Sequence, residues 1–465
     1  MAKKNSQIMM DGGELKRELG LWAATAIVVG NVSGSGIFMS PASFARVTNP
    51  KVAIVAWILT SLGSLLIALS FANLGSKIPK TGGPIVYTRA AFGDFAGFLI
   101  AWSFWIGSWV GNDAIITAFM SYFTYFFPST NNPMSAFLIC SAVIWIVTFI
   151  NIIGVKYVGK IGIVSTILKV AVLAVFIFIA FINFNPRFMN TISSPEVEGM
   201  KTLSSGIAIA LWAFVGLESA TVAGGEIKNP EKNIRRSTVY GILIIGVIYI
   251  IISIVSMGAM DQAALANSNA PMADIIDAAT GANWGGPFIA VGAMISTFGA
   301  VCGWTLTTAR CAVGAAEDGL FPKIFKSVSP KYNTPVVTLV INGICMNLLL
   351  LMNYIGTLQS VFDFMILLAT LSFLPAYSFT TVAEIVLLFK KSKDFNFINF
   401  LKSSFFSLLA FAYSIYAIYG TGAEVVMYGF ILMLVGIPIY VYMMMQRNKE
   451  NNNIDELRKS AGLDV

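Results

Sequence analysis

The sequence predicts an all-α, polytopic membrane protein, and three observations point to this class. Of its 465 residues, 57% are hydrophobic and only 11% are charged, which is too apolar for a soluble protein of this length. Twelve apolar stretches approach the roughly 20 residues that a helix needs to cross a bilayer. Lysine and arginine concentrate between alternate stretches, as they do in the cytoplasmic loops of membrane proteins.

The expected spans follow one another from residue 18 to residue 446, so 18–446 is predicted to be a single transmembrane domain. Residues 1–17 and 447–465 are expected to be short cytoplasmic ends. In order, the twelve expected spans are 18–42, 52–75, 96–125, 133–153, 160–184, 203–224, 236–258, 285–312, 335–352, 360–389, 402–420 and 424–446.

The basic residues test this number of spans, because one missed or invented span would scramble their alternation. Both ends of the chain and the loops after the even-numbered spans together carry 24 lysines and arginines, whereas the opposite loops carry four. Lys169 and Arg310 fall inside spans. This bias places both termini in the cytoplasm of a protein that crosses the cell membrane repeatedly. The four basic residues expected outside are Arg46, Lys51, Arg187 and Lys201.

Several function classes are disfavoured by composition. The net charge of +7 follows from the topology and does not indicate nucleic-acid binding, which requires a clustered basic surface. The four cysteines show no metal-binding spacing, and the lack of histidine removes the usual proton shuttle and metal ligand. The sequence therefore predicts no metal and no cofactor, and it disfavours an enzyme.

Glycines interrupt the first and sixth spans. Residues 30–38 read GNVSGSGIF and residues 211–220 read LWAFVGLESA. Unwound backbone at membrane depth survives only where it lines a cavity or is buried in protein. A pair of glycine-interrupted segments in the two halves of a membrane protein points to the substrate site of a transporter. Close packing of small residues between helices is the alternative reading.

A helix break of this kind exposes hydrogen-bond donors on one side and acceptors on the other. Freed amides at the start of the second half-helix attract an anion such as a carboxylate. Carbonyls at the end of the first half-helix can accept hydrogen bonds from an ammonium group. Two opposed breaks can therefore hold the head group of a zwitterionic amino acid without any buried side-chain charge.

The two interrupted segments resemble the first-helix and sixth-helix motifs of the amino acid–polyamine–organocation superfamily. The resemblance extends over residues 19–390 through three further motifs: KNPEKNI at 228–234, GWTL at 303–306 and EDGLFP at 317–322. It is greatest to the bacterial arginine–agmatine antiporters and related basic amino acid or polyamine antiporters. The resemblance implies two inverted repeats of five spans with broken helices 1 and 6. It also implies alternating access, with exchange preferred over sodium symport.

By this resemblance, amides near Ser35 and Gly36 would bind the substrate carboxylate. Carbonyls of Val32, Trp212 and Val215 would meet the amino group. The indoles of Trp212 and Trp304 would supply aromatic faces for a cation. The complete implied substrate-binding set is Val32, Ser35, Gly36, Gly107, Ser108, Asn112, Ile115, Trp212, Val215 and Trp304.

Ionisable residues at membrane depth are functional candidates. The resemblance implies that Glu218 helps to close the outer side of the site. Lys169 resembles the fifth-helix lysine of several sodium-independent members, where an ammonium could replace the sodium ion of sodium-driven relatives, although the arginine–agmatine type lacks this lysine. A structural and a proton-coupled role for Lys169 both remain open. Asp113 and Asp363 could recognise the distal ammonium of a substrate, or they could pair with Arg310 or Lys169 because buried charges need partners.

The substrate-specific end of the site departs from the arginine–agmatine pattern. The two gate tyrosines of that pattern correspond to Phe104 and Ala376 here, and a pocket serine corresponds to Leu368. The expected partners are amino acids or amines and the lipid bilayer, and a homodimer is left open. A cationic or polyamine-like substrate is favoured. Exchange or proton symport of neutral amino acids is the alternative, and a helical channel or receptor is a distant one.

Overall fold

Helices make up nearly all the regular structure of the computed structural model, which describes residues 19–79, 82–222, 227–281, 284–352, 357–390 and 396–460. Within these ranges the only strand-like pairing is an isolated bridge between Leu19 and Ile227. The predicted all-α class is confirmed.

Ten of the expected spans correspond to single helices. Their ends differ from the expected ones by a few residues, except that α17 continues well beyond residue 446. The ten helices are α3 (Pro50–Lys77), α5 (Asp94–Phe126), α6 (Pro133–Ile153), α7 (Val155–Ile182), α10 (Pro230–Ala259), α13 (Gly285–Glu317), α14 (Val336–Met352), α15 (Leu358–Phe389), α16 (Phe397–Gly420) and α17 (Ala423–Ser460).

The first and sixth spans are broken, as their glycines predicted. The first consists of α1 (Leu21–Val32) and α2 (Gly36–Val47), whose axes bend by 43° at the break. The sixth consists of α8 (Leu203–Trp212) and α9 (Ser219–Val222), with turns between them. α2 continues to Val47 although the expected span ended at residue 42, and this brings Arg46 into the last helical turn.

Eight helices in the described ranges are long and apolar enough to cross a membrane, or nine if α1 and α2 are one span. α14 is a shorter apolar helix, and α5, with 33 residues, is not among the eight. The chain is therefore a multi-pass membrane protein. The number of twelve spans and the inverted repeat remain predictions.

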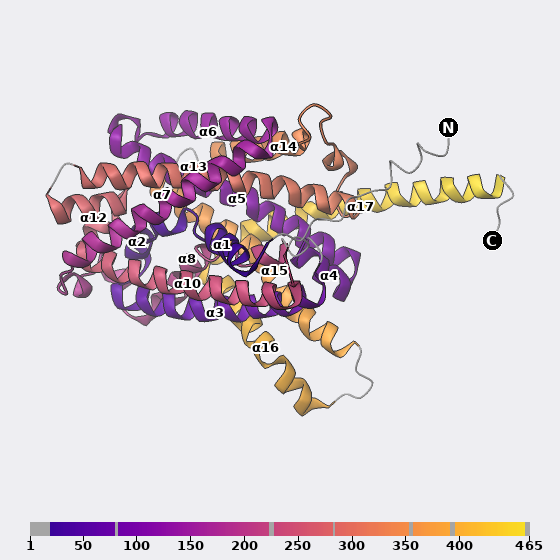
Figure 1. Cartoon of the computed structure of the whole chain (residues 1–465), viewed down its shortest axis with the longest axis horizontal. Helices are drawn as coiled ribbons and strands as arrows, with labels where there is room; N and C mark the ends of the chain where they lie inside the picture. Colours follow the sequence, from indigo (N-terminus) through magenta and orange to yellow (C-terminus); the bar gives the residue numbers. More distant parts are fainter. Residues whose placement is uncertain are drawn as a thin grey trace.

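α5 lies inside the bundle and packs against α13 and α15, while α10 packs against α3 and α1. The two broken spans meet between these groups. α16 and α17 lie at the periphery and extend out of the bundle (Figure 1). Only 28% and 11% of their apolar windows are buried, which suits helices that face lipid.

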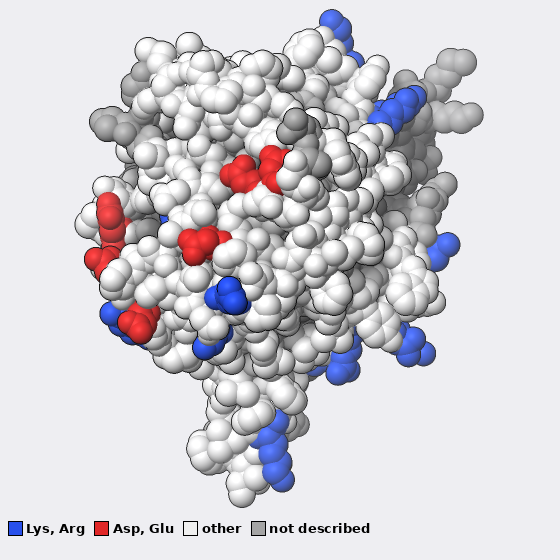
Figure 2. All heavy atoms as spheres, turned by 90° about the vertical axis from the view of Figure 1, so that its left-hand side faces the viewer, with Lys and Arg blue, Asp and Glu red and all other residues white. Residues whose placement is uncertain are grey.

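The remaining α-helices of the described residues are α4 (Pro84–Phe92), α11 (Gln262–Ala266) and α12 (Pro271–Thr280). α12 lies at the end of the bundle opposite the C-terminal end of α17 (Figure 1). Figure 2 views that end and shows a few charged side chains of both signs on an otherwise uncharged face. α12 lies between the seventh and eighth expected spans, in a segment that the sequence predicted to be outside.

Candidate functional site

The first break lies between Val32 and Gly36. The amide of Ser33 still donates to the carbonyl of Val29 at 3.0 Å, but the helix does not continue beyond it. The amides of Ser35, Gly36 and Ile37 have no hydrogen-bond acceptor among the residues that the structure describes. Ser35 is the N-cap of α2, and Gly36 and Ile37 begin its first turn, where free amides carry the positive end of the helix dipole.

The second break runs from Ala213 to Glu218 and turns at Gly216, whose φ of +104° is a conformation that favours glycine. A Cβ atom on Gly216 would lie 3.3 Å from the carbonyl of Asn31. The side chain of Asn31 in turn donates to the hydroxyl of Ser219 at 3.0 Å. The two breaks are therefore in direct contact.

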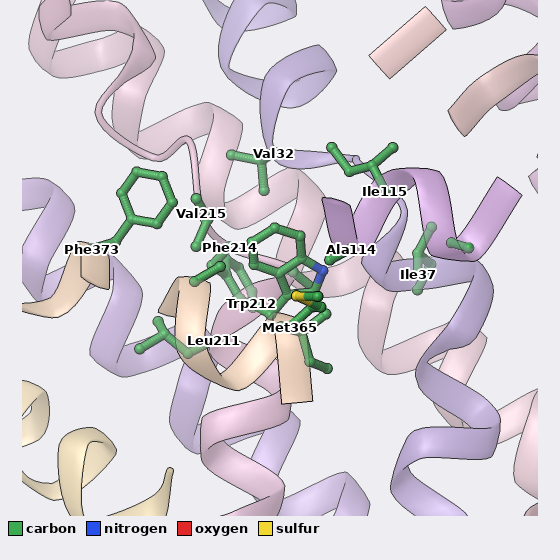
Figure 3. Close-up of a cluster of buried hydrophobic side chains, with 14 of the residues drawn as sticks. Val32, Ile37, Ala114, Ile115, Leu211, Trp212, Phe214, Val215, Met365 and Phe373 are labelled. Carbon is green, nitrogen blue, oxygen red and sulfur yellow. The ribbon is translucent and has the colours of Figure 1, made fainter. Parts of the chain in front are cut away.

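Trp212, at the end of α8, fills the space between the first break and α5. A Cβ atom on Gly36 would lie 3.0 Å from the indole Cδ1 of Trp212, and one on Gly111 would lie 2.8 Å from its Cη2. Figure 3 shows the indole in the middle of a cluster of buried apolar side chains that includes Val32 and Ile115. Glycines on both sides are thus needed to admit this ring.

A small cavity of about 20 Å³ lies between the two breaks. It is bounded by α1, α2 and the second break, and by α5, α13 and α15. Nine of the ten residues predicted to bind substrate line it. The lining comprises Asn31, Val32, Gly34, Ser35, Gly36, Gly107, Ser108, Gly111, Ile115, Trp212, Val215, Trp304 and Phe373.

The tenth predicted residue, Asn112, lies beside the cavity but not in its lining. Its side chain is buried, and its amide donates to the hydroxyl of Thr308 at 3.4 Å. Its carbonyl oxygen has no partner in the described structure. Asn112 therefore retains one unused acceptor near the site, and its predicted role remains a prediction.

Phe373 is the main lining residue that the sequence did not single out. Its ring centroid lies 6.1 Å from that of Trp304 and 4.9 Å from that of Phe104. None of the described lining residues is charged. Trp304 and Phe373 together give the cavity an aromatic wall, and the sequence had pointed to Trp304 but not to Phe373.

Lys169 on α7 is buried and donates to the carbonyl of Ser33 inside the first break. The break would otherwise leave this carbonyl without a helical donor. The ammonium group thus fastens the unwound backbone of span 1 to α7. This contact fits either role that the sequence left open for Lys169.

Glu218 lies at the end of the second break and is 2% exposed. The hydroxyl of Tyr377 on α15 donates to its carboxylate at 3.1 Å. Neither residue lines the cavity. Because Ala376 had been matched to a gate tyrosine, the sequence suggested that this tyrosine was missing, but Tyr377 in the next position reaches the acid.

Asp363, on α15, lies outside the cavity lining, and the expectation that Arg310 or Lys169 pairs with it is wrong. Its partner is Arg46, whose Nε and Nη2 lie 2.7 Å and 3.0 Å from the carboxylate oxygens. Ser43 also donates to it, at 2.6 Å. Arg46 further donates to the carbonyl of Ala266 at 3.0 Å, so this cluster ties α2 to α11 and α15.

Asp113 is fully buried on α5 and does not line the cavity. Neither of its carboxyl oxygens has a hydrogen-bond partner among the described residues. Arg310, the other partner that the sequence offered, is exposed. Nothing in this arrangement brings Asp113 to a substrate in the cavity.

The Arg46–Asp363 pair should make a measurable contribution to stability. Both side chains are less than one-fifth exposed, and the guanidinium contacts both carboxylate oxygens. We expect Asp363→Asn and Arg46→Gln each to lower the melting temperature in detergent. In a double-mutant cycle, we expect a coupling free energy of about 1 kcal/mol. Additive effects of the two substitutions would contradict this assignment.

The chain matches the amino acid permease family over residues 19–445. A protein of Bacillus subtilis (strain 168), provisionally named an arginine/ornithine antiporter, is 32% identical over 94% of this chain and 99% of its own length. The arginine/agmatine antiporter of Chlamydia pneumoniae is 30% identical over 91% of this chain and 90% of its own length. The cadaverine/lysine antiporter of Escherichia coli (strain K12) is 33% identical over 67% of this chain and 70% of its own length. These matches confirm the resemblance seen in the motifs, and the chain belongs to the amino acid permease family.

Proposed function

We propose that the protein is a secondary amino acid transporter that exchanges one amine-bearing substrate for another across the cell membrane. The observation that carries this proposal is the cavity between two helix breaks, with the free amides of Ser35 and Gly36 at its edge. Such amides suit a carboxylate, and the carbonyls of the opposite break suit an ammonium. The names of the relatives, all antiporters of amino acids or amines, favour exchange.

The proposed mechanism is alternating access. The broken spans, with α3 and α10, would rock against the remaining helices and expose the cavity to one side at a time. Bound substrate would complete the contacts between the breaks and so favour the transition, whereas an empty carrier would not cross. Residues 18–446 would form the transport domain, and both termini would lie in the cytoplasm. No enzymatic step is proposed.

The relatives favour a cationic substrate such as arginine, ornithine or lysine, with an amine as its exchange partner. Trp304 and Phe373 could hold the distal cation on their ring faces, each worth about 0.5–2 kcal/mol. The same uncharged lining favours a second candidate, the exchange of neutral amino acids. Asp113 and Asp363 are not proposed as recognition residues, because neither lines the cavity.

A test begins with purified protein and a panel of common amino acids, ornithine, agmatine, putrescine and cadaverine. Ligands that bind the folded state should raise the melting temperature. Each ligand found in this way is then loaded into proteoliposomes. We expect internal substrate to stimulate uptake of external labelled substrate well above that of empty vesicles. Equal uptake into empty vesicles, driven by a pH gradient alone, would contradict exchange.

A further inference from the structure

A larger concavity lies away from the candidate substrate site, on the side of the bundle formed by α5, α7 and α13. Its volume is about 650 Å³. We call it the α7 groove, and its lining comprises Phe119, Phe126, Phe127, Lys160, Ile161, Val164, Val291, Met294, Ile295 and Phe298. Lys160 is the one charged residue in this described lining, and the other nine are aliphatic, aromatic or thioether side chains.

The α7 groove opens outward rather than into the protein. Val164 on α7 is 56% exposed and Val291 on α13 is 46% exposed. Both α7 and α13 are long and apolar enough to cross a membrane, so these exposed side chains lie at membrane depth. In a bilayer such a groove is filled by lipid hydrocarbon, because the side-chain atoms that line an empty groove would lose their dispersion contacts.

Lys160 gives the groove a polar end. It lies in the second turn of α7, and Lys156 lies four residues earlier, so both project from the same face of the helix. Both lysines are exposed, so the space beside Lys160 is open. The start of α7 lies on the predicted cytoplasmic side, where membrane lipids are anionic and where lysine ammonium groups extend toward the head groups.

We propose that the α7 groove binds an anionic phospholipid of the inner leaflet. The phosphate would pair with Lys160, supported by Lys156, and the acyl chains would lie on Phe298, Ile295 and Val164. This combination of one cationic end and a long apolar wall matches an amphiphile with a negative head group. A zwitterionic lipid has its own ammonium beside the phosphate and would gain less from the lysines.

The test compares melting temperatures of the purified full chain in detergent with added phosphatidylglycerol or phosphatidylcholine of identical acyl chains. We expect phosphatidylglycerol to raise the melting temperature more, because a lipid that binds the folded state stabilises it. Lys160→Gln should remove most of this difference. Lys402→Gln is the matched control, because Lys402 is also exposed and is also the sixth residue of its helix, α16. Lys402→Gln should keep the difference between the melting-temperature increases that the two lipids give.

A second variant tests the apolar wall without changing charge. Ile295→Trp would fill part of the α7 groove, and it should also reduce the stabilisation by phosphatidylglycerol. Glycerol phosphate, which has the head group but no chains, should have no effect on the wild type. The proposal is overturned if Lys160→Gln retains the full difference, or if Lys402→Gln loses as much as Lys160→Gln. It is also overturned if the groove proves to be covered by a second copy of the chain. None of these measurements depends on transport.

Discussion

Gly36→Val should abolish substrate exchange while leaving the protein folded. Even the Cβ atom of the new side chain would lie 3.0 Å from Cδ1 of Trp212 and 3.2 Å from Cα of Ala213. The valine methyl groups would therefore push the two breaks apart and obstruct a cavity of only about 20 Å³. Uptake of labelled substrate into preloaded proteoliposomes should fall to background. Trp212→Ala, which removes the ring that Gly36 admits, should have the same result.

Gly30→Val provides the matched control. Gly30 lies in α1, close to the same break, but a Cβ atom there would meet nothing within 4 Å. This variant should transport at a rate near that of the wild type. Size-exclusion profiles of both variants establish whether they fold. Wild-type uptake by folded Gly36→Val would show that the cavity between the breaks is not the substrate site.

Lys169→Met should reduce exchange by about 10- to 100-fold. Methionine keeps much of the length of lysine but cannot donate to the carbonyl of Ser33. A hydrogen bond from a charged donor is worth about 1.5–3 kcal/mol, and each 1.4 kcal/mol corresponds to a factor of ten. Losing it would free the unwound segment from α7, so fewer molecules would hold the geometry that binds substrate. Initial rates of uptake into preloaded vesicles measure this effect.

The same substitution at Lys51, which is exposed on α3, should change the rate little. If Lys169→Met and Lys51→Met exchange substrate equally well, the contact with Ser33 has no role in transport. The experiment also bears on the resemblance to sodium-independent carriers. If the ammonium group occupies the place of a coupling ion, added sodium should leave the rate of the wild type unchanged.

The helix breaks could be predicted from the sequence because their causes are local. Gly34 and Gly36 lie within one apolar stretch, and Gly216 lies within another. Because backbone polar groups in a membrane must be hydrogen-bonded, such glycines indicate a helix break even when the packing is unknown. Nine of the ten expected substrate-binding residues line the cavity for a related reason. The resemblance to known motifs placed them, and those motifs surround the two breaks.

The contacts between distant helices could not be predicted in this way. Arg46 and Asp363 are 317 residues apart, and their pairing depends on how far α2 extends and how α15 is rotated. The expected end of span 1 at residue 42 had placed Arg46 in a loop. Likewise, the motif match pointed to position 376, but the tyrosine that reaches Glu218 is at position 377, and one residue corresponds to a rotation of about 100° around the helix. The hydrophobic pattern of a membrane helix does not resolve rotations of this size, because nearly every side chain is apolar.

The hydrogen bond between Asn31 and Ser219 has a mechanical consequence. It joins the interruption of one span to that of the other, and Gly216 packs on the same asparagine. We therefore expect a displacement of either half-helix to be transmitted to the other before any ligand binds. The paired half-helices would move together, and a ligand bound by its head group would act on both at once.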